Sequence, residues 1–283
     1  MGPWLASLSL PTLAAVVTGA FIGFAMITSG LGFAAERALR DRRIWAVPLD
    51  PGQYRFELFG HLKFFAVHIP AMIAFLHFGW LRFGDASVFL TFAGIFLGFQ
   101  PYYFLLHWAL HRRSLIRFHR WHHRSRVTTP LSGLSMGFVE AIGYAVAYYA
   151  LPALASQIAP ISAEGWALFV AFNVFGNVFG HANVEMMRGA AVRTRLVSCF
   201  APPYIYHGLH HARWVGHYGF GSTGLDRLLG TEFPDWRALH RQVDEGRPLE
   251  SLKTRNGGTE VQVPGVSSAS RGACSRDDAC PPT

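Results

Sequence analysis

Eight of the 14 histidines fall into three short clusters, and these clusters are the part of the sequence best suited to chemistry. The clusters are HWALH at 107–111, HRWHH at 119–123 and HGLHH at 207–211. Residues three and four apart share one face of a helix, so each cluster can direct two or three imidazole rings toward one point. Imidazole is a good ligand for iron and zinc. The pattern therefore predicts metal ligands at His107, His111, His119, His122, His123, His207, His210 and His211.

A ninth candidate ligand lies in a line of polar residues within an apolar segment. Asn173, Asn177, His181 and Glu185 recur at intervals of four, which predicts one polar helix face directed into a helix bundle. We add His181 to the predicted ligands. Nine imidazoles exceed the ordinary coordination number of one ion, so the sequence predicts two metal ions.

The remaining histidines are interpreted differently. A lone histidine on an apolar helix is more often a hydrogen-bonded core residue than a ligand. We apply that interpretation to His61, His68 and His77. His240 is also expected not to be a ligand.

Apolar segments long enough to cross a bilayer, about 20 residues each, would position these side chains. They lie at 12–35, 62–81, 87–110, 134–155 and 164–182. The composition agrees, because only 15% of residues are charged, against about 25% in soluble domains. Pro152 and Pro160 bracket the last connection, which could equally join half-crossing helices. We expect an all-α integral membrane protein with four to five transmembrane or half-crossing helices.

The net charge of +8 is concentrated in loops and does not form a nucleic-acid-binding face. Arginines gather in 36–63 and 111–130, whereas the alternate connections 82–87 and 156–164 contain one. The positive-inside rule then places the N-terminus outside and the histidines on the cytoplasmic side. A bacterial inner membrane is the expected location.

Two regions are expected along the chain. Residues 1–250 would form a membrane-embedded unit with a cytoplasmic, histidine-rich helical cap after Glu185. Residues 251–283 are rich in Gly, Ser, Arg, Asp and Pro, and are predicted to be disordered.

The three clusters resemble the histidine boxes of the fatty acid hydroxylase and sterol desaturase superfamily. Glu140 lies 17 residues after His123, the end of the second cluster, where many members have a glutamate. HAN at 181–183 resembles the additional histidine segment of the family, and HYGFGSTGLDRLLGT at 217–231 resembles another family stretch. The resemblance covers about residues 60 to 232.

The resemblance implies an O2-dependent non-haem di-iron oxidoreductase that hydroxylates or desaturates a membrane lipid, such as a fatty acyl chain, a sterol or a related isoprenoid. Two iron ions are the expected cofactors, and zinc could replace them in purified material. No segment resembles a haem, flavin or nicotinamide site. Electrons are therefore expected from a separate ferredoxin, or from a cytochrome b5-type donor with its reductase.

The resemblance also implies roles around the centre. Glu140, Asn183 and Glu185 are expected to support the ligands, and Glu185 could instead be a ligand itself. Asp226 and Arg227 are expected to organise the cap.

The sequence departs from the family at two places. Residues 134–138, LSMGF, replace the usual basic and histidine-proline positions. His217 replaces a common asparagine and could supply a tenth nitrogen, directly or through water. Both changes leave the substrate open.

Several other functions remain compatible with the pattern. The same site could catalyse carotenoid ring hydroxylation, sterol methyl oxidation or ether-lipid cleavage. A membrane metal transporter or sensor would place ligands at both membrane faces, whereas these gather on one side. A catalytically inactive lipid-binding relative would have lost ligands, whereas all three boxes are intact.

Overall fold

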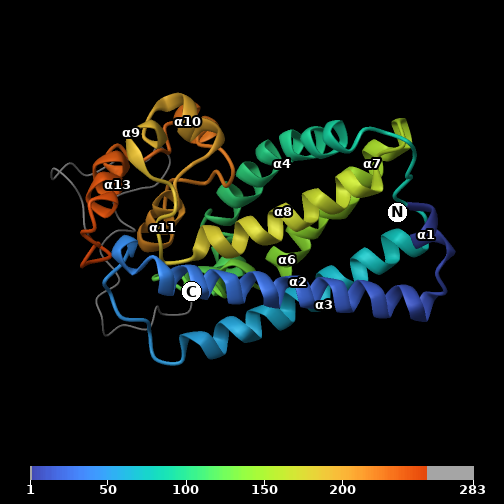
Figure 1. Cartoon of the computed structure of the whole chain (residues 1–283), viewed down its shortest axis with the longest axis horizontal. Helices are drawn as coiled ribbons and strands as arrows, with labels where there is room; N and C mark the ends of the chain where they lie inside the picture. The colour runs from blue at the N-terminus through green and yellow to red at the C-terminus, as the bar shows by residue number, and fades with distance from the viewer. Residues whose placement is uncertain (1, 254–283) are drawn as a thin grey trace.

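The fold is an elongated bundle of long helices with a cap of short helices at one end (Figure 1). A computed structural model describes residues 2–253, and within that range there are isolated β-bridges but no β-strand. The bundle consists of α2 (Leu10–Ala38), α3 (Gln53–His77), α4 (Val88–Leu110), α6 (Phe138–Ala145), a π-helical turn (Val146–Ala150), α7 (Leu151–Ile158) and α8 (Ala163–His181). The short α1 (Gly2–Ser7) lies at the end of the bundle far from the cap (Figure 1). The cap consists of α5 (Ile116–His123), α9 (Gly189–Val192), α10 (Arg195–Phe200), α11 (Tyr204–Arg213), α12 (Gly224–Leu228) and α13 (Trp236–Asp244).

Four segments are long and apolar enough to cross a membrane, which confirms the predicted all-α fold with four to five crossing helices. They are Leu10–Ala38, Gln53–His77, Val88–Leu110 and Phe138–Ile158. The fifth expected segment, 164–182, is helix α8 and is not one of the four. Its polar residues Asn173 and Asn177 lower its hydropathy. The helix lies inside the bundle, where it packs against α2, α4 and α11.

The second span lies nearer the N-terminus than the expected 62–81. Helix α3 begins at Gln53 because its polar residues Gln53 and Glu57 are buried with hydrogen-bond partners. It ends at His77, and Gly79 then adopts a positive φ of 65° that turns the chain back.

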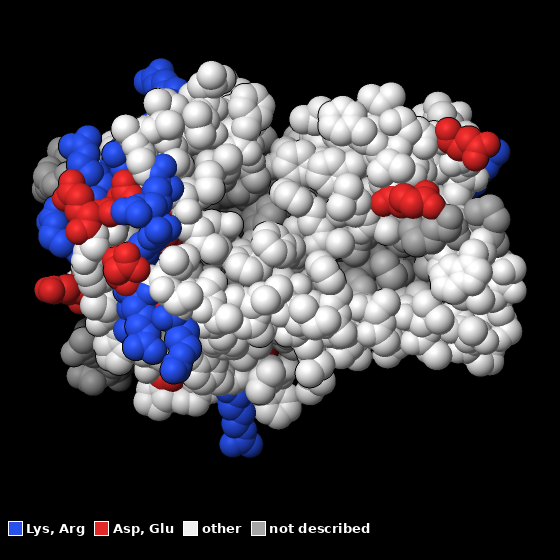
Figure 2. All heavy atoms as spheres, viewed as in Figure 1, with Lys and Arg blue, Asp and Glu red and all other residues white. Residues whose placement is uncertain are grey.

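The outer surface of the bundle is apolar. Large side chains such as Met26, Phe89 and Ile158 are 68%, 73% and 91% exposed. Figure 2 shows Lys, Arg, Asp and Glu gathered at the cap end, a middle almost free of charge on the face shown, and a few charged groups at the opposite end. An apolar band with charged ends is the surface of a protein that lies in a bilayer.

The cap has its own apolar core and is tied to the bundle by a short extended segment. Trp45, Tyr206 and Trp236 are buried in that core. Trp45 forms a β-bridge to Leu249, and Arg43 forms one to Val184. The segment after α2 thus fixes the cap to the chain that leaves α8. Residues 254–283 lie outside the described residues, so the expected disorder of 251–283 stays a prediction.

Candidate metal centre

All nine histidines singled out from the sequence come together where the bundle meets the cap. They form two groups, and within each group the candidate ligand atoms lie within 4.8 Å of one another. The first group is His107, His111, His119, His123 and His210, and the second is His122, His181, His207 and His211. Each group draws on helices that are distant in sequence.

In the second group, four Nε2 atoms converge. His181 Nε2 lies 3.0 Å from His207 Nε2, 3.1 Å from His211 Nε2 and 3.2 Å from His122 Nε2. His207 Nε2 and His211 Nε2 are 3.2 Å apart. One shared proton could join one such pair of nitrogen atoms, but it could not satisfy three that face one another.

Backbone carbonyls fix which ring nitrogen carries the proton in this group. The Nδ1 atoms of His122, His181 and His211 donate to the carbonyls of Ser135, Asn177 and Ser125 at 3.1, 2.6 and 3.0 Å. A neutral ring that donates through Nδ1 has a bare lone pair at Nε2. Three lone pairs directed at one point repel one another unless a cation lies between them. The donor set therefore fits a metal ion.

The first group shows the same arrangement. His107 Nδ1 donates to the Tyr218 carbonyl at 2.9 Å, and His210 Nδ1 donates to the Gly216 carbonyl at 2.7 Å. His107 Nε2 lies 3.1 Å from His119 Nε2. His210 Nε2 is buried and has no hydrogen-bond partner among the described residues. Buried nitrogens without partners are costly, so this group also fits a metal.

Burial keeps these rings neutral. It lowers the pKa of His122 to about 4, and it lowers the pKa of His123 and His211 well below the ordinary 6.5. Neighbouring histidines lower the last two further. Only the neutral imidazole can ligate a metal, so the site holds its histidines in the form that binding needs.

Helical spacing explains how the boxes reach the site. His107 lies on the last turn of α4 and His111 follows that helix, while α5 and α11 carry the other two boxes. In α5, His119 and His123 enter one group while His122 enters the other. Helix α11 divides likewise, with His210 in the first group and His207 and His211 in the second. The HxxHH pattern thus contributes to both groups from one helix.

Glu140 supports the first group. Its Oε1 accepts a hydrogen bond from His119 Nδ1 at 2.8 Å, and the carboxylate is 1% exposed. This contact leaves the Nε2 atom of His119 to face His107. Such carboxylate–imidazole pairs fix the orientation of a ligand and raise its basicity.

Asp226 organises the loop that carries the carbonyl partner of His107. Its carboxylate accepts from the backbone N–H groups of Tyr218 and Gly219, both at 2.8 Å, and from the Thr231 hydroxyl at 2.6 Å. Arg227 contacts Glu232 and Ser198. Both residues have the cap-organising contacts expected of them.

Within residues 2–253, no hydrogen bond or ion pair joins Asn183 or Glu185 to the nine candidate ligands, although Glu185 lies 4.0 Å from His240 Nε2. The Asn183 amide accepts from Trp45 N–H at 2.8 Å and donates to the Trp45 carbonyl at 3.1 Å. Glu185 accepts from the N–H groups of Tyr204 and Ile205 at 3.3 and 2.9 Å, at the start of α11. Glu185 therefore holds in place the helix that carries the third box and lies outside both groups of candidate ligands.

His217, considered as a tenth ligand, lies outside both groups. Its Nδ1 donates to the Tyr206 carbonyl at 2.8 Å, and its Nε2 accepts from Phe233 N–H at 2.8 Å. Its ring stacks on Tyr206 with centroids 3.4 Å apart. Both nitrogens are used by backbone groups, so the ring supports the cap and has no free nitrogen for a metal.

Sequence analysis missed Glu57. This fully buried carboxylate accepts from the hydroxyls of Ser125, Thr129 and Ser132, each at 2.7 Å, and from the Gln53 amide at 2.8 Å. The carbonyl of Ser125 is the partner of His211 Nδ1. A lone glutamate inside an apolar helix, followed in sequence by a hydroxyl-rich loop, was the available signal.

Trp214 was also missed. Its ring packs against His123 with centroids 4.9 Å apart, and the residue has a positive φ of 64°. That conformation is uncommon for a bulky residue and ends α11, with Trp214 N–H donating to the His210 carbonyl at 2.8 Å. The half-buried indole thus covers one ligand of the first group.

Comparison with known proteins agrees with this geometry. Residues 92–231, which contain all nine histidines, match the family model described as fatty acid hydroxylase. The chain is 31% identical over 140 residues to the very-long-chain aldehyde decarbonylase CER1 of Arabidopsis thaliana. It is 30% identical over 156 residues to the very-long-chain aldehyde decarbonylase GL1-6 of Oryza sativa subsp. indica. No solved structure gives a significant match.

The matched segments cover 46% and 51% of this chain but only 21% and 23% of those two relatives. The chain therefore spans less than a quarter of the length of these two relatives. The chain belongs to the fatty acid hydroxylase and sterol desaturase superfamily, as its histidine boxes had suggested.

Proposed function

We propose that this protein is a membrane-embedded, O2-dependent non-haem di-iron oxidoreductase that hydroxylates or desaturates a lipid. The observation that carries the proposal is the convergence of nine histidines in two groups. Six of them donate through Nδ1 to a carbonyl or a carboxylate, so their Nε2 lone pairs are directed toward the interior of each group. Two iron ions bound there would supply the power to activate O2 and break an unactivated C–H bond, which no side chain could do alone.

The residues of the chain would hold and shield the reaction. The His107 and His181 side chains are 1% exposed, so little bulk water reaches the centre. The site lies beside the apolar band of the bundle, which supports a fatty acyl, sterol or isoprenoid chain reaching it from the bilayer. We place the cap on the cytoplasmic side of a bacterial inner membrane, because arginines concentrate at that end. A separate ferredoxin or cytochrome b5-type donor would supply electrons there.

A long-chain aldehyde is a second candidate substrate. The two relatives described above are named very-long-chain aldehyde decarbonylases. An aldehyde would present a polar carbonyl to the same centre, with its alkyl chain in the bilayer.

Metal content tests the centre directly. We would purify the full chain in detergent and measure iron and zinc per polypeptide by elemental mass spectrometry. The parent should contain two metals, and His210→Ala and His181→Ala should each lose about one, since each removes a ligand from a different group. His77→Ala is the matched control and should keep both, because His77 is exposed and is not the core residue that the sequence suggested. Folded parent protein without stoichiometric metal would refute the proposal.

Lipid analysis then separates the two candidate substrates. Cells that express the parent, or the metal-deficient double variant His181→Ala/His210→Ala, would be grown under 18O2 and their lipids extracted. Labelled hydroxyl groups or new double bonds only with the parent support hydroxylation or desaturation. Loss of a supplied long-chain aldehyde, with a shorter alkane formed, supports the second candidate.

A further inference from the structure

A separate pocket lies where helix α2 leaves the apolar band. Its volume is about 510 Å³, within the range of ligand-binding sites. The lining comes from the end of α2, the segment after it, the start of α3, the loop after α5 and the segment after α8. The lining includes Glu36, Arg37, Arg40, Arg43, Tyr54 and Thr128. None of the nine histidines lines it.

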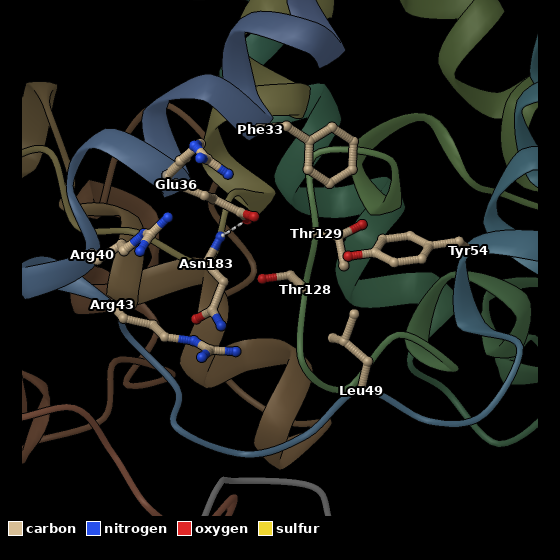
Figure 3. A pocket seen from close by; sticks show the side chains of 10 residues that line it. Phe33, Glu36, Arg40, Arg43, Leu49, Tyr54, Thr128, Thr129 and Asn183 are labelled. Carbon is tan, nitrogen blue, oxygen red and sulfur yellow. Dashed lines mark hydrogen bonds between the residues drawn. The ribbon is translucent and has the colours of Figure 1, made fainter.

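The pocket is positively charged. Arg37, Arg40 and Arg43 are exposed, and among residues 2–253 no guanidinium group of the three makes a hydrogen bond or an ion pair. Figure 3 shows Arg40 and Arg43 along one side of the space and Tyr54 with Thr129 on the other. Arginine is well suited to bind phosphate groups because its planar fork of donors matches their oxygens.

One acid also lines the pocket. The Glu36 carboxylate accepts from Asn183 N–H at 2.7 Å, as the dashed line in Figure 3 marks, and it attracts Arg43. This single acid offsets part of the charge, so three cations face one anion. An anionic ligand remains favoured.

The hydroxyl of a largely buried threonine points into the same space. Thr128 is 1% exposed, and no described residue hydrogen-bonds to its hydroxyl. Figure 3 shows that its oxygen is directed into the pocket, toward the side formed by Arg40 and Arg43. This hydroxyl, beside the exposed guanidinium groups, provides donors that an anionic oxygen could use.

The surroundings of the pocket point to a lipid as the source of that anion. On α2, Ile27 and Leu31 are 65% and 55% exposed, and on α3, Leu58 and Leu62 are 53% and 62% exposed. These apolar side chains precede the pocket on α2 and follow it on α3. A ligand whose charged head filled the pocket could therefore lay an apolar chain along the same helices. Basic pockets at the end of membrane helices bind anionic head groups in this way.

We propose that this pocket binds the phosphate head group of an anionic membrane phospholipid. The guanidinium groups would contact the phosphate oxygens, and the acyl chains would lie along α2 and α3. This site is distinct from the metal centre, and the proposal does not depend on what the centre catalyses.

Lipid binding by the full chain in neutral detergent tests the proposal. We would titrate short-chain phosphatidylglycerol, phosphatidylcholine and inorganic phosphate, and follow bound lipid by native mass spectrometry. The parent should bind phosphatidylglycerol saturably and in preference to phosphatidylcholine. Arg40→Gln/Arg43→Gln should weaken that binding by roughly tenfold or more, since it removes two cations from the head-group level.

The matched control is Arg195→Gln/Arg241→Gln, which removes the same charge from exposed cap positions outside the pocket. It should bind phosphatidylglycerol as the parent does. Equal affinity in the parent and the pocket variant would overturn the proposal, as would equal weakening by both double variants. Binding of inorganic phosphate without binding of phosphatidylglycerol would also overturn it, because the pocket would then serve a soluble anion. Metal content, measured on each sample, checks that every variant is folded.

Discussion

At the scale of single residues, the hydrogen bond made by Nδ1 of each ring prepares the metal site as much as the position of Nε2 does. His107, His122 and His181 each donate Nδ1–H to a carbonyl, so their Nε2 lone pairs are free before any ion arrives. A ligand held in this way pays little entropy on binding, because its rotamer and tautomer are already fixed. His119 differs from the others because its partner is the carboxylate of Glu140.

We expect Glu140→Gln to weaken metal binding by the first group roughly 10- to 100-fold. An amide oxygen can still accept from His119 Nδ1, but it lacks the negative charge that makes the ring a stronger ligand. Competition with a chelator of known affinity would measure the change. Glu164→Gln, an exposed substitution at the other end of the bundle, is the control. Unchanged metal affinity in Glu140→Gln would show that the negative charge of Glu140 does not strengthen metal binding.

Glu57 supports the second group through the loop after α5. Glu57→Ala would leave four donors without their acceptor, at a cost of roughly 1 to 3 kcal/mol for each one that stays buried. We expect a lower thermal midpoint and loss of metal from the group that contains His211, because Ser125 would shift. Scanning calorimetry and metal analysis would test this, beside Asp85→Ala as an exposed control. A large loss of stability with full metal content would show that this loop stabilises the fold but does not position the metal ligands.

At the scale of elements, helical spacing allowed the nine histidines to be predicted, because three- and four-residue intervals fix a shared face. The partners of those histidines could not be predicted in the same way. Glu57 and Ser125 are 68 positions apart and meet only because α3 packs beside the loop after α5. His217 showed the opposite problem. Its place at the position of a common family asparagine suggested a possible ligand, whereas a positive φ of 53° turns its ring into the cap core.

Helix α11 gives the clearest element-scale prediction. Burial raises the pKa of Glu185, which holds the first residues of α11, from 4.5 to about 7, although three backbone N–H groups lower it. A carboxyl whose pKa is raised by folding stabilises the protein fully below about pH 4.5, and that stabilisation is lost as the pH rises through about 7. Glu185→Gln cannot titrate. The thermal midpoint of the variant, relative to that of the parent, should therefore rise as the pH increases from about 5 to about 8.

The comparison reports on Glu185 together with its neighbour His240, whose Nε2 lies 4.0 Å from the Glu185 carboxylate, because the nine candidate ligands are unchanged in both proteins. Differential scanning fluorimetry across that pH range, at constant metal content, would measure it. A parent and a variant whose midpoints stay parallel would mean that the Glu185 carboxyl keeps its ordinary pKa in the folded protein.

At the scale of the whole molecule, the metal centre joins two parts with separate apolar cores. The bundle core surrounds residues such as Phe64 and Trp166, while the cap core surrounds Trp45 and Trp236. Each histidine group takes its nitrogens from both parts. His181 ends a bundle helix, for example, and His211 belongs to the cap. Bound metal would therefore act as a link between bundle and cap.

Removing that link should destabilise the whole protein. A ligand that binds only the folded state stabilises it by about 4 kcal/mol when its concentration is a thousand times Kd, and unopposed lone pairs add repulsion once it leaves. We expect a chelator to lower the thermal midpoint of the parent by about 10 °C, and ferrous iron to restore it. His122→Ala/His210→Ala, which lacks a ligand in each group, should not respond. If the parent loses its metal and keeps its midpoint, the cap must be held by its apolar core and the bridges of Arg43 and Trp45 alone.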